Sequence, residues 1–410
     1  MIYNQKIEVL FSKEDSLILD SQSKMCNWLY NQLLEICIND YKNGKPLKLQ
    51  SGRNLRNQVP KIKEKNPFLY SVHSSPLKNV ALRLKTTYER SFKHLGGLPK
   101  FKSWKKKWFS LYYEEPFNGY KVNNKELKIS LGKRHYVYGT LKENLKSNNI
   151  KTFRLIKEKN KFYAIFTIED VTPKVIEEPK SFISIDPNHK NLFVAIDNEG
   201  LTYEFEKLYQ TKYFDKIIDE LKSKRDLCNR KHKKRVSPNG KNYYVPNKRW
   251  VKLDNAIKCV ENRRREQIKS IMYSIAHFIT DKFDHILIGD YAPSTDTAKY
   301  DKMHRSMLNQ TNIGEFRNIL KWVCTKKGKQ FTIVNEKDTT KTCCICSHKE
   351  KKTPDIREFT CSNCNTFILR DVNSAVNISK KEGKIIKKPV LDKIINYGYF
   401  DLNKYQLVVK

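Results

Sequence analysis

Residues 334–378 read VNEKDTTKTCCICSHKEKKTPDIREFTCSNCNTFILRDVNSAVNI, and this stretch decides how the rest of the chain is interpreted. It holds two Cys-x-x-Cys pairs, Cys343/Cys346 and Cys361/Cys364, with fourteen residues between them. Two such pairs can surround one Zn²⁺ with four thiolates in tetrahedral geometry. The spacing therefore predicts a structural zinc site.

Other potential ligands lie near these pairs. Cys344 and His348 are alternative zinc ligands, but the two complete pairs make either exchange unnecessary. Glu336 precedes the first pair and Asp371 follows the second, and both are too far along the chain to complete the same zinc shell. These two carboxylates therefore require a separate explanation.

The overall composition points to a large, basic protein. Its 410 residues predict two to four domains. Lys and Arg total 80 against 44 Asp and Glu, a formal charge of +36, which favours a nucleic-acid partner. A membrane surface is disfavoured, since there is no long apolar run and the N-terminus is too short and polar for a signal peptide. Ten cysteines fit metal ligation in a reducing compartment, either a prokaryotic cytoplasm with its nucleoid or a eukaryotic nucleus.

The first half of the chain reads as strands with a helical insertion. Residues 1–11 alternate like a strand, and short alternating segments return between 111 and 171. Between them, apolar residues recur at helical spacing over about 21–41 and again from Pro76 to the glycine pair at 96–97. We predict a small β-barrel or sandwich interrupted by helices.

The pattern changes after the proline-bearing linker at 173–179. Three apolar strands in succession, followed by helices, predict the antiparallel opening of an RNase H-like fold. A helix starting at Asp371 and an unplaced strand-like tail at 405–409 complete this half. The expected strands are 182–186, 192–197, 201–205, 285–288 and 330–335, and the expected helices are 207–235, 248–283 and 313–327.

Basic residues gather in several stretches that suit nucleic acid. Residues 99–109 interleave lysines with aromatic rings, a pattern that can bind phosphates and stack bases. A solvated edge strand is the alternative there, and a solvated helix face is the alternative for the basic helices. The candidate nucleic-acid contacts are Lys102, Trp104, Lys105, Arg230, Lys231, Arg263, Arg264 and Arg370.

Acidic residues at strand ends of an RNase H-like sheet can hold divalent cations. Asp186 ends the first strand of that sheet, and Asp371 begins a helix where it can also serve as the N-cap. The third acid is either Glu336 or Asp290, each at the end of a later strand. Such a cluster predicts Mg²⁺ or Mn²⁺ and two-metal hydrolysis of a phosphodiester.

The run from Cys343 through Arg370-Asp371-x-Asn373-Ser374-Ala375-x-Asn377 closely resembles the C-terminal signature of TnpB nucleases, their Fanzor relatives and compact type V CRISPR effectors. Further similar motifs are Ile185-Asp186-Pro187, the arginines at 263–265, Pro99–Ser103 and Asn27-Trp28-Leu29. The resemblance implies an RNA-guided DNA endonuclease whose partners are a guide RNA and target double-stranded DNA. It leaves open whether the protein is a monomer or a dimer.

The resemblance also implies a domain order in an α+β multidomain fold. A wedge β-barrel (1–20 and 98–175) would carry a helical recognition insertion (21–97). A RuvC-like, RNase H-like domain (180–342 and 365–410) would carry a zinc-ribbon insertion (343–364) and end in a basic tail.

One position departs from the family pattern. Most TnpB proteins have glutamate where this chain has Gly289, whereas a subset resembles this chain in carrying a glutamate before the first Cys pair, at the position of Glu336. The resemblance thus favours Asp186, Glu336 and Asp371 as the catalytic set, with Asp290 as a further candidate. A catalytically silent RNA-guided DNA-binding protein and a transposase or resolvase that cuts without RNA are the alternatives.

Overall fold

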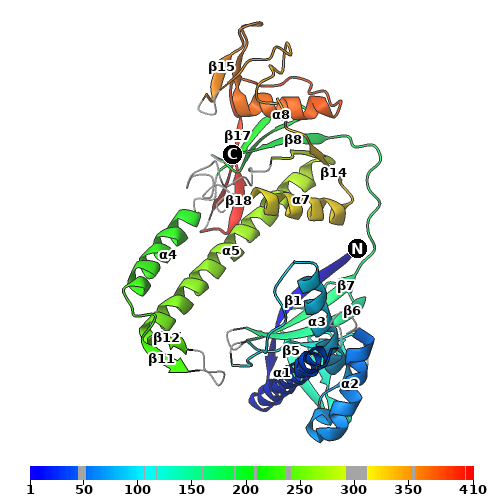
Figure 1. The fold of residues 1–410 in the computed structure, drawn as a ribbon. Helices are drawn as coiled ribbons and strands as arrows, with labels where there is room; N and C mark the ends of the chain where they lie inside the picture. The colour runs from blue at the N-terminus through cyan, green and yellow to red at the C-terminus, as the bar shows by residue number, and fades with distance from the viewer. Residues whose placement is uncertain are drawn as a thin grey trace. The chain divides into compact units, whose positions relative to one another are not determined.

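A computed structural model describes the chain except for residues 45–51, 106, 117, 159–160, 189–190, 207–209, 237–241, 292–311, 353–355 and 402. The chain forms two compact units, Met1–Val171 and Thr172–Lys410. Figure 1 shows their elements. Within the described ranges, every helix is too short or too polar to cross a membrane.

The N-terminal unit is built on one seven-stranded sheet in the order β2-β6-β7-β1-β5-β4-β3. All neighbouring strands are antiparallel, and β1 pairs with β7 along most of its length and with β5 at its end, so the sheet curls into a near-closed barrel. Of the two architectures predicted, a barrel or a sandwich, the structure therefore has the barrel. Its strands are β1 (Ile2–Phe11), β2 (Leu111–Tyr113), β3 (Tyr120–Asn123), β4 (Glu126–Ser130), β5 (Tyr136–Leu141), β6 (Ile150–Glu158) and β7 (Lys161–Glu169).

Three helices follow β1 and share a hydrophobic core with the sheet. They are α1 (Lys13–Lys42), α2 (Gly52–Lys65) and α3 (Ser74–Phe92). A short 3₁₀ helix, Pro67–Ser71, lies between α2 and α3, and another, Gly132–Arg134, lies between β4 and β5. The prediction that the first helix starts near residue 21 is wrong. The helix begins at Lys13, because the Ser12 side chain accepts a hydrogen bond from the backbone N–H of Asp15 and acidic residues fill the first turn.

The C-terminal unit holds a mixed sheet in the order β14-β13-β8-β9-β10-β17-β18. As predicted, the first three strands in sequence are antiparallel, since β9 pairs antiparallel with both β8 and β10. Strand β13 is parallel to both β8 and β14. The tail forms two more strands, of which β17 is parallel to β10. The strands are β8 (Phe182–Pro187), β9 (Phe193–Asp197), β10 (Thr202–Phe205), β13 (His285–Gly289), β14 (Gln330–Val334), β17 (Asn396–Asp401) and β18 (Gln406–Val409).

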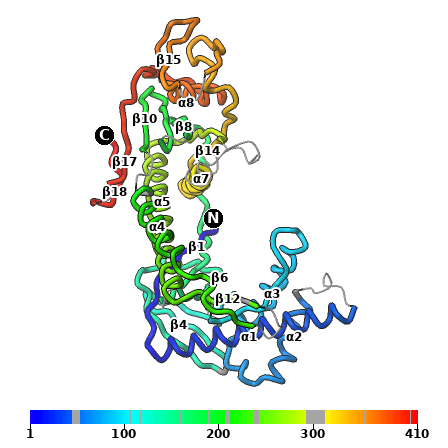
Figure 2. The backbone as a smooth tube through the Cα atoms, turned by 60° about the vertical axis from the view of Figure 1, so that its left-hand side comes forward, coloured from blue at the N-terminus to red at the C-terminus, as the bar shows by residue number. Residues whose placement is uncertain are grey.

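Helices α4 (Gln210–Asp226) and α5 (Lys248–Lys282) lie side by side, and Arg264 of α5 forms a 3.2 Å ion pair with Asp215 of α4 (Figures 1 and 2). The predicted helix over 207–235 is wrong beyond Asp226. Residues 233–236 instead form β11 (Lys233–Val236), which pairs with β12 (Asn242–Val245) in a hairpin between the two helices.

Two further helices border the sheet. Helix α7 (Ile313–Lys327) has Gly328 as its C-cap and leads into β14. Glycine readily adopts the φ of +67° found at this position. Helix α8 (Arg370–Lys381) packs on β8 and β9, and residues Val372–Ser379 are all buried. The strands β8 and β13 thus lie against α8, and Val334 at the end of β14 packs with Ile378 in the second half of that helix.

Candidate active site and metal centre

The four cysteines of the two Cys-x-x-Cys pairs converge. Their Sγ atoms all lie within 4.8 Å of one another, with 3.7 Å between Cys343 and Cys364 and 3.6 Å between Cys346 and Cys361. A tetrahedral zinc with Zn–S bonds of about 2.3 Å requires S–S edges of about 3.8 Å. The cluster therefore fits Zn²⁺, and it leaves out both Cys344 and His348.

The second cysteine pair leads directly into helix α8. It lies between β15 (Glu358–Thr360) and β16 (Phe367–Leu369), and β16 continues into the helix. The N-cap of α8 is Leu369, not Asp371 as predicted, so Asp371 lies within the first turn. Its carboxylate forms 3.1 Å ion pairs with Arg357 and Arg370.

Asp186 is the most buried of the candidate acids. It lies on β8 with 5% of its surface exposed, and its Oδ1 accepts a 2.7 Å hydrogen bond from the Ser374 hydroxyl of α8. Burial raises its pKa well above the usual value for aspartate, and the charges of Glu336 and Asp371 raise it further. The ionised form of a buried carboxylate next to two others is unfavourable unless a positive charge lies nearby.

Glu336 follows β14 and occupies the space beside Gly289 at the end of β13. A Cβ atom on residue 289 would lie 1.6 Å from Glu336 Oε1 and 2.4 Å from its Cδ. That Oε1 is buried and has no hydrogen-bond partner among the described residues. Burial raises the pKa of Glu336 to about 7, with a further contribution from the nearby Asp290.

Asp290 binds the backbone of the segment that carries Glu336. Its Oδ1 accepts a 3.0 Å hydrogen bond from the Glu336 N–H, and its Oδ2 accepts one of 3.2 Å from the Asn335 amide. Arg317 of α7 donates to the carbonyl oxygens of Gly289 and Tyr291 at 2.9 and 2.8 Å. These contacts fix the ends of β13 and β14 relative to each other.

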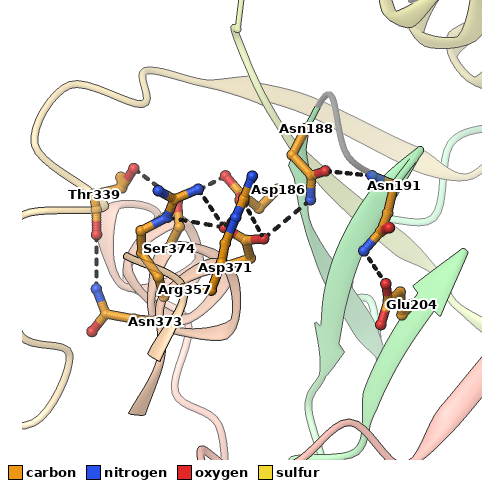
Figure 3. A network of polar contacts seen from close by, with 10 residues as sticks. Asp186, Asn188, Asn191, Glu204, Thr339, Arg357, Asp371, Asn373 and Ser374 are labelled. Carbon is orange, nitrogen blue, oxygen red and sulfur yellow. Dashed lines mark hydrogen bonds and ion pairs between the residues drawn. The ribbon is translucent and has the colours of Figure 1, made fainter. Parts of the chain in front are cut away.

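The carboxylates of Glu336 and Asp371 are each close enough to Asp186 to raise its pKa. Among the described residues, however, only the cysteines form a group of three or more ligands within 4.8 Å. Figure 3 shows Asp186 and Asp371 beside Ser374 and Arg357. The unpartnered Glu336 oxygen and the raised pKa of Asp186 both fit a divalent cation at this place.

Comparison with known proteins finds a matching family model and several similar proteins. The Cas12f1-like TNB-domain family model matches residues 314–378, which include Glu336, the cysteines and Asp371. TnpB-like protein L770 of Acanthamoeba polyphaga mimivirus is 26% identical over 409 residues, which span 92% of this chain and 73% of the relative. The chain is therefore similar to TnpB-like proteins, and one part of it matches the Cas12f1-like TNB-domain model.

Two other proteins are similar to this chain. The Cas12f1 chain in a solved complex with sgRNA and target DNA has the same fold, with a TM-score of 0.60 at 14% identity over 90% of this chain and 83% of that one. The CRISPR-associated DNA-binding protein Cas12m of Thermanaerosceptrum fracticalcis is 42% identical over 67 residues, which are 16% of this chain and 11% of the relative.

The predicted nucleic-acid contacts differ in their surroundings. Lys105 and Arg263 are exposed, whereas the guanidinium of Arg264 pairs with Asp215 and that of Arg370 pairs with Asp371. Arg230 lies over the Trp250 ring and Lys231 over the Tyr244 ring, at 5.7 and 5.5 Å from the ring centroids.

The stretch at 99–109 is fastened to α1. The Trp104 indole N–H donates to Ser23 Oγ at 3.0 Å, and Lys102 Nζ lies 3.6 Å from the Tyr30 ring centroid. Burial lowers the pKa of Lys102 to about 8. The described residues of this stretch form no strand, so the edge-strand alternative does not hold.

Several residues of the site were not singled out as site residues from the sequence. Arg357, Thr339 and Ser374 contact the acids or their backbone, and Arg317 contacts the carbonyl oxygens on either side of Asp290. The one available signal for Ser374 was its position three residues after Asp371, which places both on neighbouring positions of a helix. The polar loop position of Thr339 gave no comparable signal.

Proposed function

We propose that this TnpB-like chain is an RNA-guided DNA endonuclease with a RuvC-like site formed by Asp186, Glu336 and Asp371. The observation that carries the proposal is the relation between Gly289 and Glu336. The Glu336 carboxylate fills the space that a side chain at position 289 would need, which is what relocation of the family's glutamate requires. The chain would then belong to the subset of the family with the relocated glutamate.

The three acids would hold Mg²⁺ or Mn²⁺ in this site. When bound, such ions activate water and stabilise the leaving oxygen of a phosphodiester. Asp186 and Glu336 supply buried carboxylates from two strand ends, and Ser374 orients the former. Arg357 and Arg370 pair with the carboxylate of Asp371 at the start of α8, and Asp371 would be the third ligand.

The same proposal assigns roles to the rest of the chain. The barrel and helices of the N-terminal unit correspond to the wedge and recognition parts, the C-terminal sheet to a RuvC-like, RNase H-like domain, and the cysteine cluster to a zinc ribbon that binds target nucleic acid. The charge of +36 supports a long polyanionic partner. Base pairing with a guide RNA would supply sequence specificity, while the protein contacts the backbone.

The test uses RNA that copurifies with the expressed protein. The RNA is sequenced, and the complex is offered labelled double-stranded DNA that matches the guide region beside a randomised flanking sequence. We expect Mg²⁺-dependent cleavage at matched targets only, and its loss after RNase treatment. Cleavage that survives RNase treatment would instead indicate a transposase or resolvase that cuts without RNA.

The second candidate is a catalytically silent RNA-guided DNA-binding protein. It is favoured by Gly289 and by the similarity of 67 residues to Cas12m, which is named as a DNA-binding protein. In that case the same experiment gives RNA-dependent retention of matched DNA without cleavage.

A further inference from the structure

The segment that follows β14 and runs into the first cysteine pair, residues 335–344, is held along its length by side chains of α8. We call this segment the strap. Asn373 Nδ2 donates to the carbonyl oxygens of Thr339 and Thr342 at 3.0 and 2.8 Å. Asn377, one turn later, donates to the same two oxygens at 2.8 and 2.7 Å. The i, i+4 spacing of the two asparagines places both amides over one part of the strap.

Both ends of the strap are fixed as well. At its start, Lys381 Nζ donates to the carbonyl oxygens of Asn335 and Lys337 at 2.8 and 2.7 Å. At its end, the Cys344 N–H donates to Asn373 Oδ1 at 2.8 Å, and Lys380 contacts the Cys344 carbonyl oxygen. The strap therefore has a defined conformation between Glu336 and the cysteine cluster.

The centre of the strap is linked to both buried acids through two hydroxyl groups. The Glu336 carbonyl oxygen accepts from the Thr339 hydroxyl at 2.9 Å and from the Thr339 backbone N–H at 3.1 Å, and Thr339 Oγ1 accepts from the Ser374 hydroxyl at 2.9 Å. The Ser374 hydroxyl donates to Asp186 Oδ1 at 2.7 Å. Figure 3 shows Thr339, Ser374, Asp186 and Asn373 together.

These polar groups are inaccessible to solvent. The exposed fractions are 2% for Thr339 and zero for Ser374 and Asn373. Water cannot replace a lost hydroxyl in such a place without rearrangement, so removing one leaves its partner unsatisfied or displaces it. The contact therefore has a larger effect on geometry than the same contact at the surface.

We propose that Thr339 and Ser374 are positioning residues that set the spacing between the carboxylates of Asp186 and Glu336. Neither touches the substrate or an ion; each acts through the acid, or the acid's backbone, that it contacts. The strap connects this pair to the cysteine cluster through Asn373. The inference rests on the proposed function, since it takes both acids as ligands of a divalent cation.

The test measures Mn²⁺ binding to RNA-free, zinc-loaded protein by electron paramagnetic resonance. Thr339→Val keeps the shape of the side chain but removes the hydroxyl, and Thr339→Ser keeps the hydroxyl. We expect Thr339→Val to weaken Mn²⁺ binding at the Glu336-dependent site by about tenfold, the effect of losing one buried hydrogen bond. Thr339→Ser should stay close to wild type, and both variants should keep their zinc.

Ser374→Ala gives a second test if Thr339→Val does not fold, because alanine favours the helix and removes only the hydroxyl. It too should weaken Mn²⁺ binding. Wild-type affinity in both hydroxyl-free variants would overturn the positioning role. If wild-type protein shows no Mn²⁺ site that Glu336→Gln removes, the proposed function is wrong and this inference is wrong with it, a result distinct from the first.

Discussion

At the scale of single residues, the side chain of Glu336 occupies the volume that a side chain on residue 289 would need. The neighbouring strands β13 and β14 pair in parallel, with Gly289 opposite Val334, so Glu336 follows just beyond the pair. Its side chain turns back over the glycine. Either position could supply a carboxylate to the site, but both side chains cannot occupy the space together.

Gly289→Ala should therefore reduce cleavage while changing stability little. The new Cβ atom would overlap the end of the flexible Glu336 side chain, which can move aside, but the carboxylate then leaves its place. We expect guided DNA cleavage to fall by at least about tenfold, which corresponds to about 1.4 kcal/mol in the barrier. Initial cleavage rates and the melting temperature are measured on the same preparations.

The control is Gly314→Ala in the first turn of α7, where an added Cβ atom meets no atom within 4 Å. It should leave cleavage unchanged. The exchange Gly289→Glu with Glu336→Ala should recover part of the activity that Glu336→Ala loses. Full cleavage by Gly289→Ala would show that the position of the Glu336 side chain is irrelevant.

The raised pKa of Glu336 predicts a pH-dependent stability. Its pKa rises from an ordinary value of 4.5 to about 7 in the folded protein, mainly because of burial. The folded state then binds more protons than the unfolded state, so this group destabilises the metal-free fold as pH rises from 4.5 through 7. Above pH 7, the free energy of unfolding of Glu336→Gln should exceed that of the wild-type protein by at most about 3 kcal/mol.

Urea unfolding at pH 5 and pH 8, in magnesium-free buffer with zinc retained, measures this difference. Glu126→Gln, at an exposed position on β4, is the control and should show no such dependence. An equal effect of Glu336→Gln at both pH values would contradict the assignment of the raised pKa.

At the scale of elements, helix α8 joins the cysteine cluster to the sheet. The buried residues of the cluster and of α8 pack in one hydrophobic core with Val194 and Ile196 of β9. A change in the cluster is therefore expected to affect the sheet, because its apolar contacts are continuous with those of the helix.

Cys361→Ser should abolish stoichiometric zinc binding and lower the melting temperature. Each thiolate supplies one of four ligands, and zinc binding contributes directly to the stability of such small sites. Zinc per chain is measured with a colorimetric chelator after denaturation. Cys344→Ala, at a buried cysteine outside the cluster, should keep one zinc per chain. Loss of zinc in that control as well would mean that Cys344 is a ligand.

Elements whose apolar residues recur with a strong period were predictable from the sequence. Elements whose bounds depend on a capping residue or on pairing with another strand were not. Alternating burial along β7 and the apolar face of α5 follow directly from the sequence. Strand β11 overlaps the end of the predicted helix over 207–235, because its basic residues permit a helix and the strand depends on pairing with Tyr243 and Tyr244. The start of α1 depended on one capping serine.

At the scale of the whole molecule, the predictable part of the site was its acids. The expected sheet placed Asp186 near a third acid and left that acid open between Glu336 and Asp290, and only the family resemblance favoured Glu336. The partners of the acids were not predictable, because the contact between Ser374 and Asp186 joins residues 188 positions apart and needs the packed helix to become visible. Thr339 and Arg357 lie in irregular segments whose conformation no periodic pattern encodes.

The central claim is that Glu336 completes a nuclease site in an RNA-guided protein. The most direct measurement compares wild type with Glu336→Gln, each bound to the same guide RNA, on one labelled target DNA. Cleavage and target binding are recorded on the same samples. The account predicts that the variant binds target DNA with unchanged affinity and cleaves at less than about a hundredth of the wild-type rate, as expected when a group acting in the transition state is removed. Cleavage by Glu336→Gln at the wild-type rate would contradict it.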